Sequence, residues 1–287
     1  MVAFEVPEVD YTRYSNRQLA AVPLAVLAVA LAVIGVWMVT TGTPVALGFE
    51  FTGGTELRVD APDATAGEVA SAFSVEPESV QSASGGVYIV TFGPEAPDTS
   101  TLTTQAEAAG YSVRASSDVG ASFGRSTQLL ALGGVAVAFV GMSALVFVMF
   151  RTFVPSLAVV VSAFSDIVIP VALMNALGIE LSLGTVAALL MLIGYSVDSD
   201  ILLNNHVLRR SGDFYESVRR AMRTGVTMTL TSIAAMIVMT VVATYFGIGL
   251  LAAIGTVLTF GLVADLMNTY MLNLSLLRWY KYEGVTR

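Results

Sequence analysis

Six long apolar segments alternate with short polar ones along the chain. A helix needs about 20 apolar residues to cross the roughly 30 Å hydrocarbon core of a bilayer, and each segment is long enough. The pattern therefore predicts a polytopic α-helical membrane protein with a six-helix bundle. The first segment is longer than the apolar core of a signal peptide, about 7–15 residues, so we expect it to be a retained helix. The segments span roughly 19–41, 127–150, 153–177, 181–205, 226–246 and 248–277.

Residues 42–126, between the first two apolar segments, follow a different pattern. Apolar and polar residues alternate where strands are expected, and apolar residues fall at helical spacing in between. The resulting order, βαββαβ, predicts an extracytoplasmic ferredoxin-like α+β domain. Its sheet should have two helices on one face and leave the other available for a partner; nothing in it suggests a catalytic set. Strands are expected at Thr55–Asp60, Val80–Ser84, Val87–Phe92 and from Tyr111, with a turn at Gly85-Gly86 and helices around 66–73 and 102–109.

Basic residues near helix ends predict the orientation, because they are enriched on the cytoplasmic side. With six spans, the basic residues of the N-terminal arm 1–18, of two connections and of the tail 278–287 all fall on one side. We therefore expect both termini to be cytoplasmic and the domain 42–126 to be extracytoplasmic in the cell membrane. These residues are Arg13, Arg17, Arg151, Arg209, Arg210, Arg219, Arg220, Arg223, Arg278, Lys281 and Arg287.

The composition of the chain excludes several kinds of covalent link, catalytic group and metal site. Only 13% of residues are charged, against about 25% in soluble proteins. The chain has no cysteine and one histidine, which excludes disulfides, thiol catalysis and cysteine or histidine-rich metal sites. We expect no cofactor, no metal, no enzymatic activity and no nucleic-acid partner. Residues 42–126 hold 11 acidic residues and three arginines, a net charge of −8, and this acidity predicts a halophile, because strong salt screens carboxylate repulsion.

The candidate functional residues are acids inside the apolar segments. A carboxylate at the centre of a membrane helix costs about 2.5–3.5 kcal/mol on insertion scales, so a proton or ion pathway is the first hypothesis and polar contact between helices the alternative. Asp200 shares a helix face with Asn204, and Asp265 with Asn268, whereas Asp198 and Asp200 lie about 200° apart around their helix. The candidates are Asp166, Asp198, Asp200, Asn204, Asp265 and Asn268.

Other residues have plainer interpretations. His206 should lie at the cytoplasmic interface, and the arginines of 209–223 should be orientation signals. Glycines in two of the apolar segments should allow close helix packing. They are Gly133, Gly134, Gly141, Gly255 and Gly261.

Four motifs, in this order and spacing, resemble the SecF branch of the SecD/SecF family, within the resistance-nodulation-division superfamily, and the resemblance covers essentially the whole chain. Gly48-Phe49-Glu50-Phe51-Thr52-Gly53-Gly54-Thr55 is similar to its G-x-D/E-F-x-G-G-T signature, and 118–124 to its V-G-x-S-x-G motif. Gly194-Tyr195-Ser196-Val197-Asp198 is similar to G-Y-S-x-N/D. Arg223-Thr224-Gly225 with Thr231-Ser232 is similar to R-T…T-S.

The resemblance implies a complex with SecD, association with the SecY translocon, and a role in pulling or releasing unfolded exported polypeptide outside the lipid bilayer. It also implies coupling to proton flow in the bacterial members. Two departures prevent a direct transfer of their relay. The family aspartate falls on Ser199, between Asp198 and Asp200, and the family arginine of helix 5 falls on Thr227, with Arg223 about one turn away. The form of these motifs resembles the archaeal, haloarchaeal branch.

Three other functions fit the sequence less well. A small-molecule or lipid exporter of the same superfamily usually has two six-helix halves, and this chain has one. An intramembrane aspartyl protease needs a G-x-G-D setting that residues 194–198 do not supply. A purely structural scaffold leaves the cost of four membrane acids unexplained. We expect Gly53 and Gly54 to hold a backbone conformation that no side chain fits.

Overall fold

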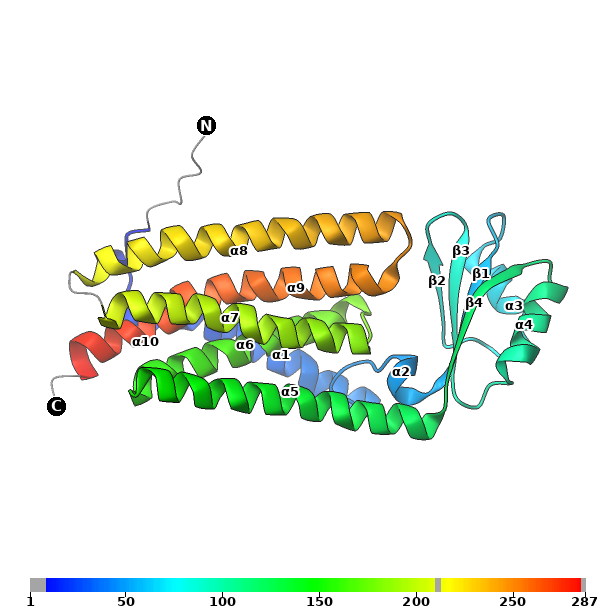
Figure 1. The fold of residues 1–287 in the computed structure, drawn as a ribbon, viewed down its shortest axis with the longest axis horizontal. Coiled ribbons are helices and arrows are strands. Elements are labelled where there is room, and N and C mark those ends of the chain that lie inside the picture. Colours follow the sequence, from blue (N-terminus) through cyan, green and yellow to red (C-terminus); the bar gives the residue numbers. More distant parts are fainter. Residues whose placement is uncertain (1–8, 210–212, 285–287) are drawn as a thin grey trace, which may run out of the picture.

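The computed structural model describes residues 9–209 and 213–284, and within them six long helices form a bundle with a small sheet domain at one end (Figure 1). All six are long and apolar enough to cross a membrane, as predicted. Their bounds are α1 Asn16–Thr41, α5 Ala121–Phe150, α6 Phe153–Leu177, α7 Leu183–Arg209, α8 Phe214–Tyr245 and α9 Gly249–Met267. The last continues through the π-helix η2 Asn268–Asn273, then α10 Leu274–Trp279 and a second π-helix, η3 Tyr280–Gly284.

The first and last described residues lie at the end of the bundle away from the sheet (Figure 1). The N-terminal arm contains the 3₁₀-helix η1, Tyr11–Arg13, whose Tyr11 side chain is buried. Arg278 of α10 donates to the carbonyl of Tyr11 over 3.0 Å and to that of Tyr14 over 2.8 Å. Two residues used to predict the orientation, Arg210 and Arg287, lie outside the described residues.

Two helices begin earlier than the apolar segments that predicted them. The α5 helix begins at Ala121 and α8 at Phe214, because a helix continues through polar residues that hydropathy assigns to loops. At the start of α8, the Asp213 carboxylate accepts from the backbone N–H groups of Tyr215 and Glu216, which satisfies two of the donors left free at a helix N-terminus.

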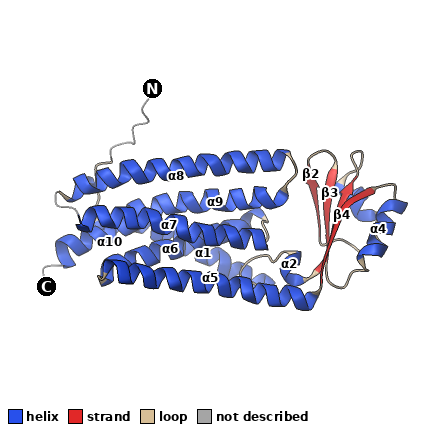
Figure 2. Cartoon of the chain, in the orientation of Figure 1, coloured by secondary structure: helices blue, strands red, loops and turns tan. Residues whose placement is uncertain are grey.

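The sheet domain has the predicted βαββαβ order (Figure 2). Its antiparallel strands lie in the order β2-β3-β1-β4. Leu57, Val90 and Leu102 are fully buried in the core on the face covered by the two helices, and the open face is turned toward the bundle (Figure 1). The bounds are α2 Phe49–Thr52, β1 Gly54–Asp60, α3 Ala66–Ser71, β2 Ser79–Ala83, β3 Val87–Phe92, α4 Thr99–Ala108 and β4 Ser112–Val119.

The helices of the bundle differ in how far they are covered. In their most apolar 18-residue windows, 61% of α6 and 56% of α7 are buried, against 6% of α5 and 11% of α8. The centre of the bundle is therefore built on α6, α7 and α9, and the outer helices present apolar side chains to their surroundings.

The prediction that glycines allow close packing of helices is confirmed for α9 only. A Cβ on Gly255 would overlap the Thr240 hydroxyl of α8, and a Cβ on Gly261 would overlap Leu192 of α7. These two glycines do allow close packing. The prediction is wrong for Gly133, Gly134 and Gly141 within the described residues, where a Cβ would meet nothing within 4 Å, because α5 lies at the edge of the bundle.

Candidate functional site

Three of the predicted acids meet at the centre of the bundle. Asp166 comes from α6, Asp200 from α7 and Asp265 from α9, and no more than 1% of any of them is exposed. Each reaches a hydrogen-bonded network that joins the three helices. We call these three acids with their hydrogen-bonding partners the polar cluster; the partners are Ser196, Ser199, Asn268, Thr269 and Asn273.

Asp166 has a donor on each carboxylate oxygen. Asn268 donates from Nδ2 to Oδ1 over 2.6 Å, and Ser196 donates from Oγ to Oδ2 over 2.6 Å. Both donors are fully buried. The two donors come from different helical segments, so this pair of hydrogen bonds joins α7 and the end of α9 to α6.

Asp200 and Asp265 share one hydroxyl donor. The Thr269 Oγ1 lies 2.9 Å from Oδ1 of Asp200 and 3.2 Å from Oδ1 of Asp265. A threonine has a single hydroxyl proton, so it can donate to only one of the two carboxylates at a time. The Ser199 hydroxyl lies 2.7 Å from the same Asp265 oxygen and 3.3 Å from Thr269 Oγ1. A change of charge on one acid can therefore change the hydrogen bonding of the other, because the shared hydroxyl can rotate from one to the other.

The donors on the α9 side come from one irregular turn. Asn268, Thr269 and Asn273 all belong to the π-helix η2, and Asn273 donates from Nδ2 to Asp200 Oδ1 over 2.7 Å. Short π-helical turns inside α-helices occur frequently at functional sites. Here the turn directs three polar side chains toward carboxylates from α6, α7 and α9.

The polar cluster has more acceptors than donors. Among the described residues, four of its oxygens have no hydrogen-bond partner: Asp200 Oδ2, Asp265 Oδ2, Asn268 Oδ1 and Asn273 Oδ1. No described arginine or lysine is paired with the three acids, and the described residues contain no group of three ligands spaced for a metal ion. Buried charges are costly unless compensated, so the cluster is chemically suited to take up protons or a small cation.

Two of the sequence candidates lie outside the cluster. Asp198 is exposed on the opposite side of α7 from Asp200, as the separation of about 200° predicts, so it does not join the polar cluster, and its part in an ion pathway stays a prediction. Asn204 is buried, but its Nδ2 donates to the Pro155 carbonyl over 3.3 Å rather than to a carboxylate. The sequence reasoning missed Thr269 and Asn273; they lie four and eight residues after Asp265, so extending its helical stripe would have found them.

The first two sequence motifs pack against each other at the base of the sheet domain. Gly53 has φ +85° and Gly54 φ +128°. A Cβ on Gly53 would lie 2.6 Å from Ala121 Cα, and one on Gly54 would overlap the Phe92 carbonyl oxygen, which agrees with the expectation that no side chain fits. The Thr55 hydroxyl donates to Asp118 over 2.9 Å. This joint connects β1 to the start of α5.

The first motif, residues 48–55, also attaches the sheet domain to the bundle. The Gly48 N–H donates to the Leu181 carbonyl over 2.9 Å, and the Glu50 carboxylate accepts from the N–H of Leu183, the first residue of α7, over 2.6 Å. Phe51, only 2% exposed, packs into the apolar core of the bundle with Leu181 and Val186. A displacement of α7 would therefore move the base of the sheet domain through these contacts.

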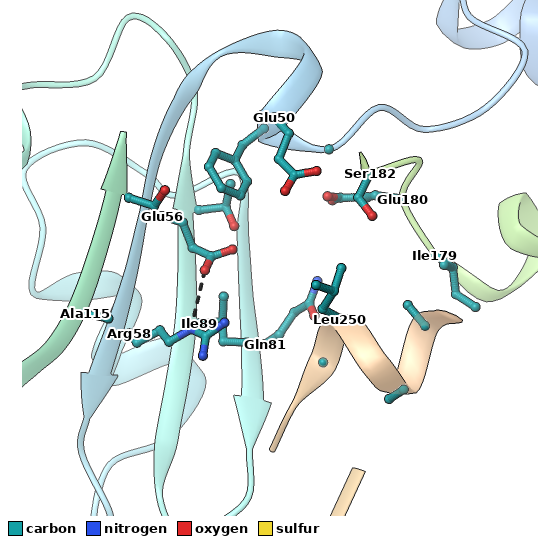
Figure 3. A pocket seen from close by; sticks show the side chains of 18 of the residues that line it. Glu50, Glu56, Arg58, Gln81, Ile89, Ala115, Ile179, Glu180, Ser182 and Leu250 are labelled. Atoms are coloured by element: carbon teal, nitrogen blue, oxygen red, sulfur yellow. Dashed lines mark ion pairs between the residues drawn. The ribbon is translucent and has the colours of Figure 1, made fainter. Parts of the chain in front are cut away.

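A cleft of about 840 Å³ separates the open sheet face from the end of the bundle nearest to it. Glu56 and Arg58 on the sheet form an ion pair at 3.6 Å and face Glu180 and Ser182 across it (Figure 3). Burial, followed by the nearby charges of Glu78 and Glu56, raises the pKa of Glu180 above its ordinary value. The cleft is thus bordered by carboxylates on both sides.

The remaining motif residues have structural or surface positions. Thr231 and Ser232 lie on the outer helix α8, and the Thr231 hydroxyl donates to the Thr227 carbonyl over 2.6 Å. Arg223 is exposed on the same helix. His206 Nδ1 lies 2.8 Å from the Leu202 carbonyl and does not contact the polar cluster. Gly194 and Tyr195 are exposed on α7.

Comparison with known proteins identifies the family. The family model "Protein export membrane protein SecD/SecF, C-terminal" matches residues 99–283. Protein-export membrane protein SecF of Haloferax volcanii is 76% identical over 288 residues, and that of Haloquadratum walsbyi 70% identical over 291; each alignment covers all of both chains. SecF of Methanolacinia petrolearia is 41% identical and covers 96% of this chain and 97% of its own.

A solved structure agrees on the fold. SecDF of Thermus thermophilus, described as a translocon-associated membrane protein, superposes with a TM-score of 0.76 at 20% identity over 96% of this chain. The matched part is 39% of that longer chain, so this chain corresponds to about two fifths of it. Together with the full-length identity to the haloarchaeal relatives, these matches establish that the chain belongs to the SecD/SecF family of protein-export membrane proteins.

Proposed function

We propose that this chain is an auxiliary subunit of the Sec protein-export machinery that acts with SecD at the SecY translocon to promote translocation and release of unfolded exported polypeptides. The observation that carries the proposal is identity of 76% and 70% to SecF proteins over the whole length. A half-size exporter of small molecules or lipids is not favoured, because those full-length relatives are protein-export components by name.

The sheet domain acts on the extracytoplasmic side in this proposal, and both termini are cytoplasmic. The helix α10, with Arg278 in its last turn, lies at the end of the bundle opposite to the domain (Figure 1). Arg278 is bonded to the arm that carries Arg13, and such basic residues favour the cytoplasmic side. The acidic domain then meets the external medium, where strong salt would screen its charge.

An ion gradient drives the domain through the polar cluster. Asp200 and Asp265 each have an unpartnered oxygen that can take up a proton or a cation. Such uptake changes the carboxylate to which the Thr269 hydroxyl donates its hydrogen bond. The contacts of α7 with its neighbours then change, and the Glu50 contact at the start of α7 carries the change to the sheet domain. Asp166 on α6 stays in place while α7 moves, because Asn268 and Ser196 each donate a hydrogen bond to one of its oxygens.

The test is pulse-labelling of a signal-peptide-bearing precursor in cells depleted of the chain, with the chase scored for mature protein outside. Wild-type chain should restore export, and the Asp200→Asn/Asp265→Asn double variant should not. The Glu107→Gln variant, with an exposed carboxylate in α4, is the matched control and should restore export fully.

The outcomes separate the two parts of the proposal. If the double variant restores export at the wild-type rate, the export role stands and the carboxylates are structural. If depletion leaves export unchanged, the export role itself is wrong and the small-molecule exporter becomes the leading function.

A further inference from the structure

A row of polar side chains crosses the open face of the sheet. The pairing register places Thr91 of β3 between Ser79 of β2 and Glu56 of β1. Glu56 in turn pairs with Ser117 of β4. Residues that alternate with core positions such as Val90 point to the other face of the sheet. These four side chains therefore form one line of hydroxyl and carboxylate groups across all four strands, which we call the polar row.

Two hydroxyl groups of the polar row have no hydrogen-bond partner among the described residues. The Ser79 hydroxyl oxygen is buried and unpartnered there. Thr91 is only 8% exposed and lines the cleft, and no described residue forms a hydrogen bond with its hydroxyl. A buried polar group without a partner is costly and calls for an explanation. The Thr91 hydroxyl is thus available to a group that enters the cleft, with the Ser79 hydroxyl beside it.

The opposite wall of the cleft comes from the helices that carry Asp200 and Asp265. The link before α7 contributes Glu180 and Ser182, and the first turn of α9 contributes Leu250 (Figure 3). No described arginine or lysine forms an ion pair with Glu180. A molecule in the cleft would therefore contact the sheet domain and, at the same time, two of the helices that the polar cluster joins.

The size and charge of the cleft indicate its occupant. Its volume of about 840 Å³ falls within the roughly 300–1,000 Å³ of ligand-binding clefts. It is lined by three carboxylates, those of Glu50, Glu56 and Glu180, and by the Arg58 guanidinium, which is already paired with Glu56. The excess of negative charge favours a cation that also donates hydrogen bonds, as an ammonium or guanidinium group does. The aliphatic stem of such a side chain can lie against apolar wall residues such as Ile89.

The length of the polar row fits an extended polypeptide. Four strands about 4.8 Å apart span about 14 Å, which an extended chain crosses in about four residues. We propose that the cleft binds an extended segment of exported polypeptide and holds a lysine or arginine side chain of that segment between the polar row and Glu180. This inference rests on the proposed function, which supplies the exported polypeptide as the substrate.

The position of the cleft connects substrate binding with movement of the helices. At the hairpin turn, the Ser84 hydroxyl donates to the Thr244 carbonyl at the end of α8 over 3.0 Å. At the base of the domain, the Glu50 carboxylate accepts from the N–H of Leu183. The cleft lies between sheet and bundle, so a displacement of α7 or α9 changes its width. A bound segment would be held in one position of these helices and released in the other.

The first experiment measures the binding of two labelled peptides to the full chain in detergent micelles. Both are unstructured and about ten residues long; one carries a pair of lysines, and the other has glutamine in their place. The lysine peptide should bind at least about tenfold more tightly, because hydrogen bonds to charged groups are the stronger ones. Glu180→Gln should remove most of this preference, and Thr91→Val should weaken binding of the lysine peptide about fivefold. Glu107→Gln, an exposed acid of α4, is the matched control and should bind as wild type does.

Equal binding of the two peptides would overturn the proposal, and so would equal effects of Glu180→Gln and Glu107→Gln. Sodium or potassium ions alone could instead raise the thermal midpoint of wild type but not of Glu180→Gln, without any preference between the peptides. A free cation would then occupy the cleft, and the proposal would be wrong. Glu180→Gln relieves repulsion from Glu78 and Glu56, so its thermal midpoint should be no lower than that of wild type. A loss of binding in this variant is then not a loss of folding.

The second experiment places the polypeptide in the cleft. Because the chain lacks cysteine, Gln81→Cys and Ser117→Cys variants, both at the cleft, can carry a photoreactive maleimide in membranes that hold an arrested precursor. Both should yield more adduct with the precursor than Glu107→Cys, which lies on the helix-covered side of the sheet. An equal yield from this control would overturn the proposal. If depletion of the chain leaves export unchanged, the proposed function fails instead, and the peptide measurement still decides whether the cleft binds cationic segments.

Discussion

Asn268 donates its amide to Asp166 over 2.6 Å and so joins a π-helical turn after α9 to a carboxylate 102 residues earlier in the chain. Both side chains are fully buried. This contact, with its partner from Ser196, makes Asp166 the best satisfied acid of the polar cluster. It also gives the polar turn that follows the apolar α9 a buried hydrogen-bond partner.

Replacement of Asn268 by leucine should destabilise the protein. The change removes one of the two donors to Asp166 and leaves a buried acceptor unsatisfied, at a cost of about 1–3 kcal/mol. Thermal unfolding in detergent, followed by circular dichroism, measures the loss. The Thr259→Val variant is the control, because its hydroxyl donates only to the Gly255 carbonyl of the same helix. An equal loss from both variants would contradict a special role for the Asn268 contact.

Gly54→Ala should disrupt the base of the sheet domain. At φ +128° an alanine is strained, and its Cβ would overlap the Phe92 carbonyl, so the substitution should cost more than about 1 kcal/mol. Faster cleavage of the domain by a protease, with the bundle still inserted in the membrane, is the expected result. In the Gly67→Ala control the new Cβ meets open space within α3, and the domain should be as resistant as wild type or more so. Equal resistance of both variants would refute the steric account.

Glu180→Gln should stabilise the contact between domain and bundle at neutral pH. The pKa of Glu180 is raised by burial and by Glu78 and Glu56, so its deprotonation penalises the folded state. The penalty is absent below the ordinary value of 4.5 and develops as pH rises from there through the raised pKa. The difference in thermal midpoint between variant and wild type should therefore grow as the pH rises above 4.5 and level off once the raised pKa is passed.

The salt dependence of stability provides an independent check of the charge repulsion at Glu180. Part of the rise in the pKa of Glu180, after the larger effect of burial, comes from Coulombic repulsion by Glu78 and Glu56. The Debye length falls to about 3 Å at 1 M salt, which screens this repulsion. High salt should reduce the gain from Glu180→Gln at neutral pH. A gain that depends on neither pH nor salt would mean that the substitution acts through packing alone.

The proposed orientation can be read with single cysteines. The chain has none of its own, so Ser100→Cys in α4 and Tyr14→Cys in the N-terminal arm each give one labelling site, and both positions are exposed. A membrane-impermeant maleimide should label the Ser100→Cys variant in intact cells and the Tyr14→Cys variant only after permeabilisation. The reverse pattern would invert the topology and exclude an extracytoplasmic domain.

The sequence by itself determined the number of membrane helices and the order of elements in the sheet domain. Transfer of an apolar segment into a bilayer depends on the segment's own residues, and the alternation of Leu57 and Val59 marks a strand without reference to its neighbours. The cost of a charge in hydrocarbon identified all four membrane acids for the same reason. The sequence also established that Asp198 and Asp200 point to different sides of one helix, because that angle follows from helix geometry.

Only the tertiary structure decided which side of α7 is inside. The rotation of a helix about its axis is set by packing with neighbours, such as the approach of α9 permitted by Gly261, and nothing local to residues 194–204 specifies it. Packing buried Asp200 and left Asp198 exposed. It also brought Thr269 and Asn273 to Asp200 through a π-helical turn that no propensity marks. Which acids act together is thus a property of the packed helices, since a hydrogen bond requires two groups to meet within about 3 Å.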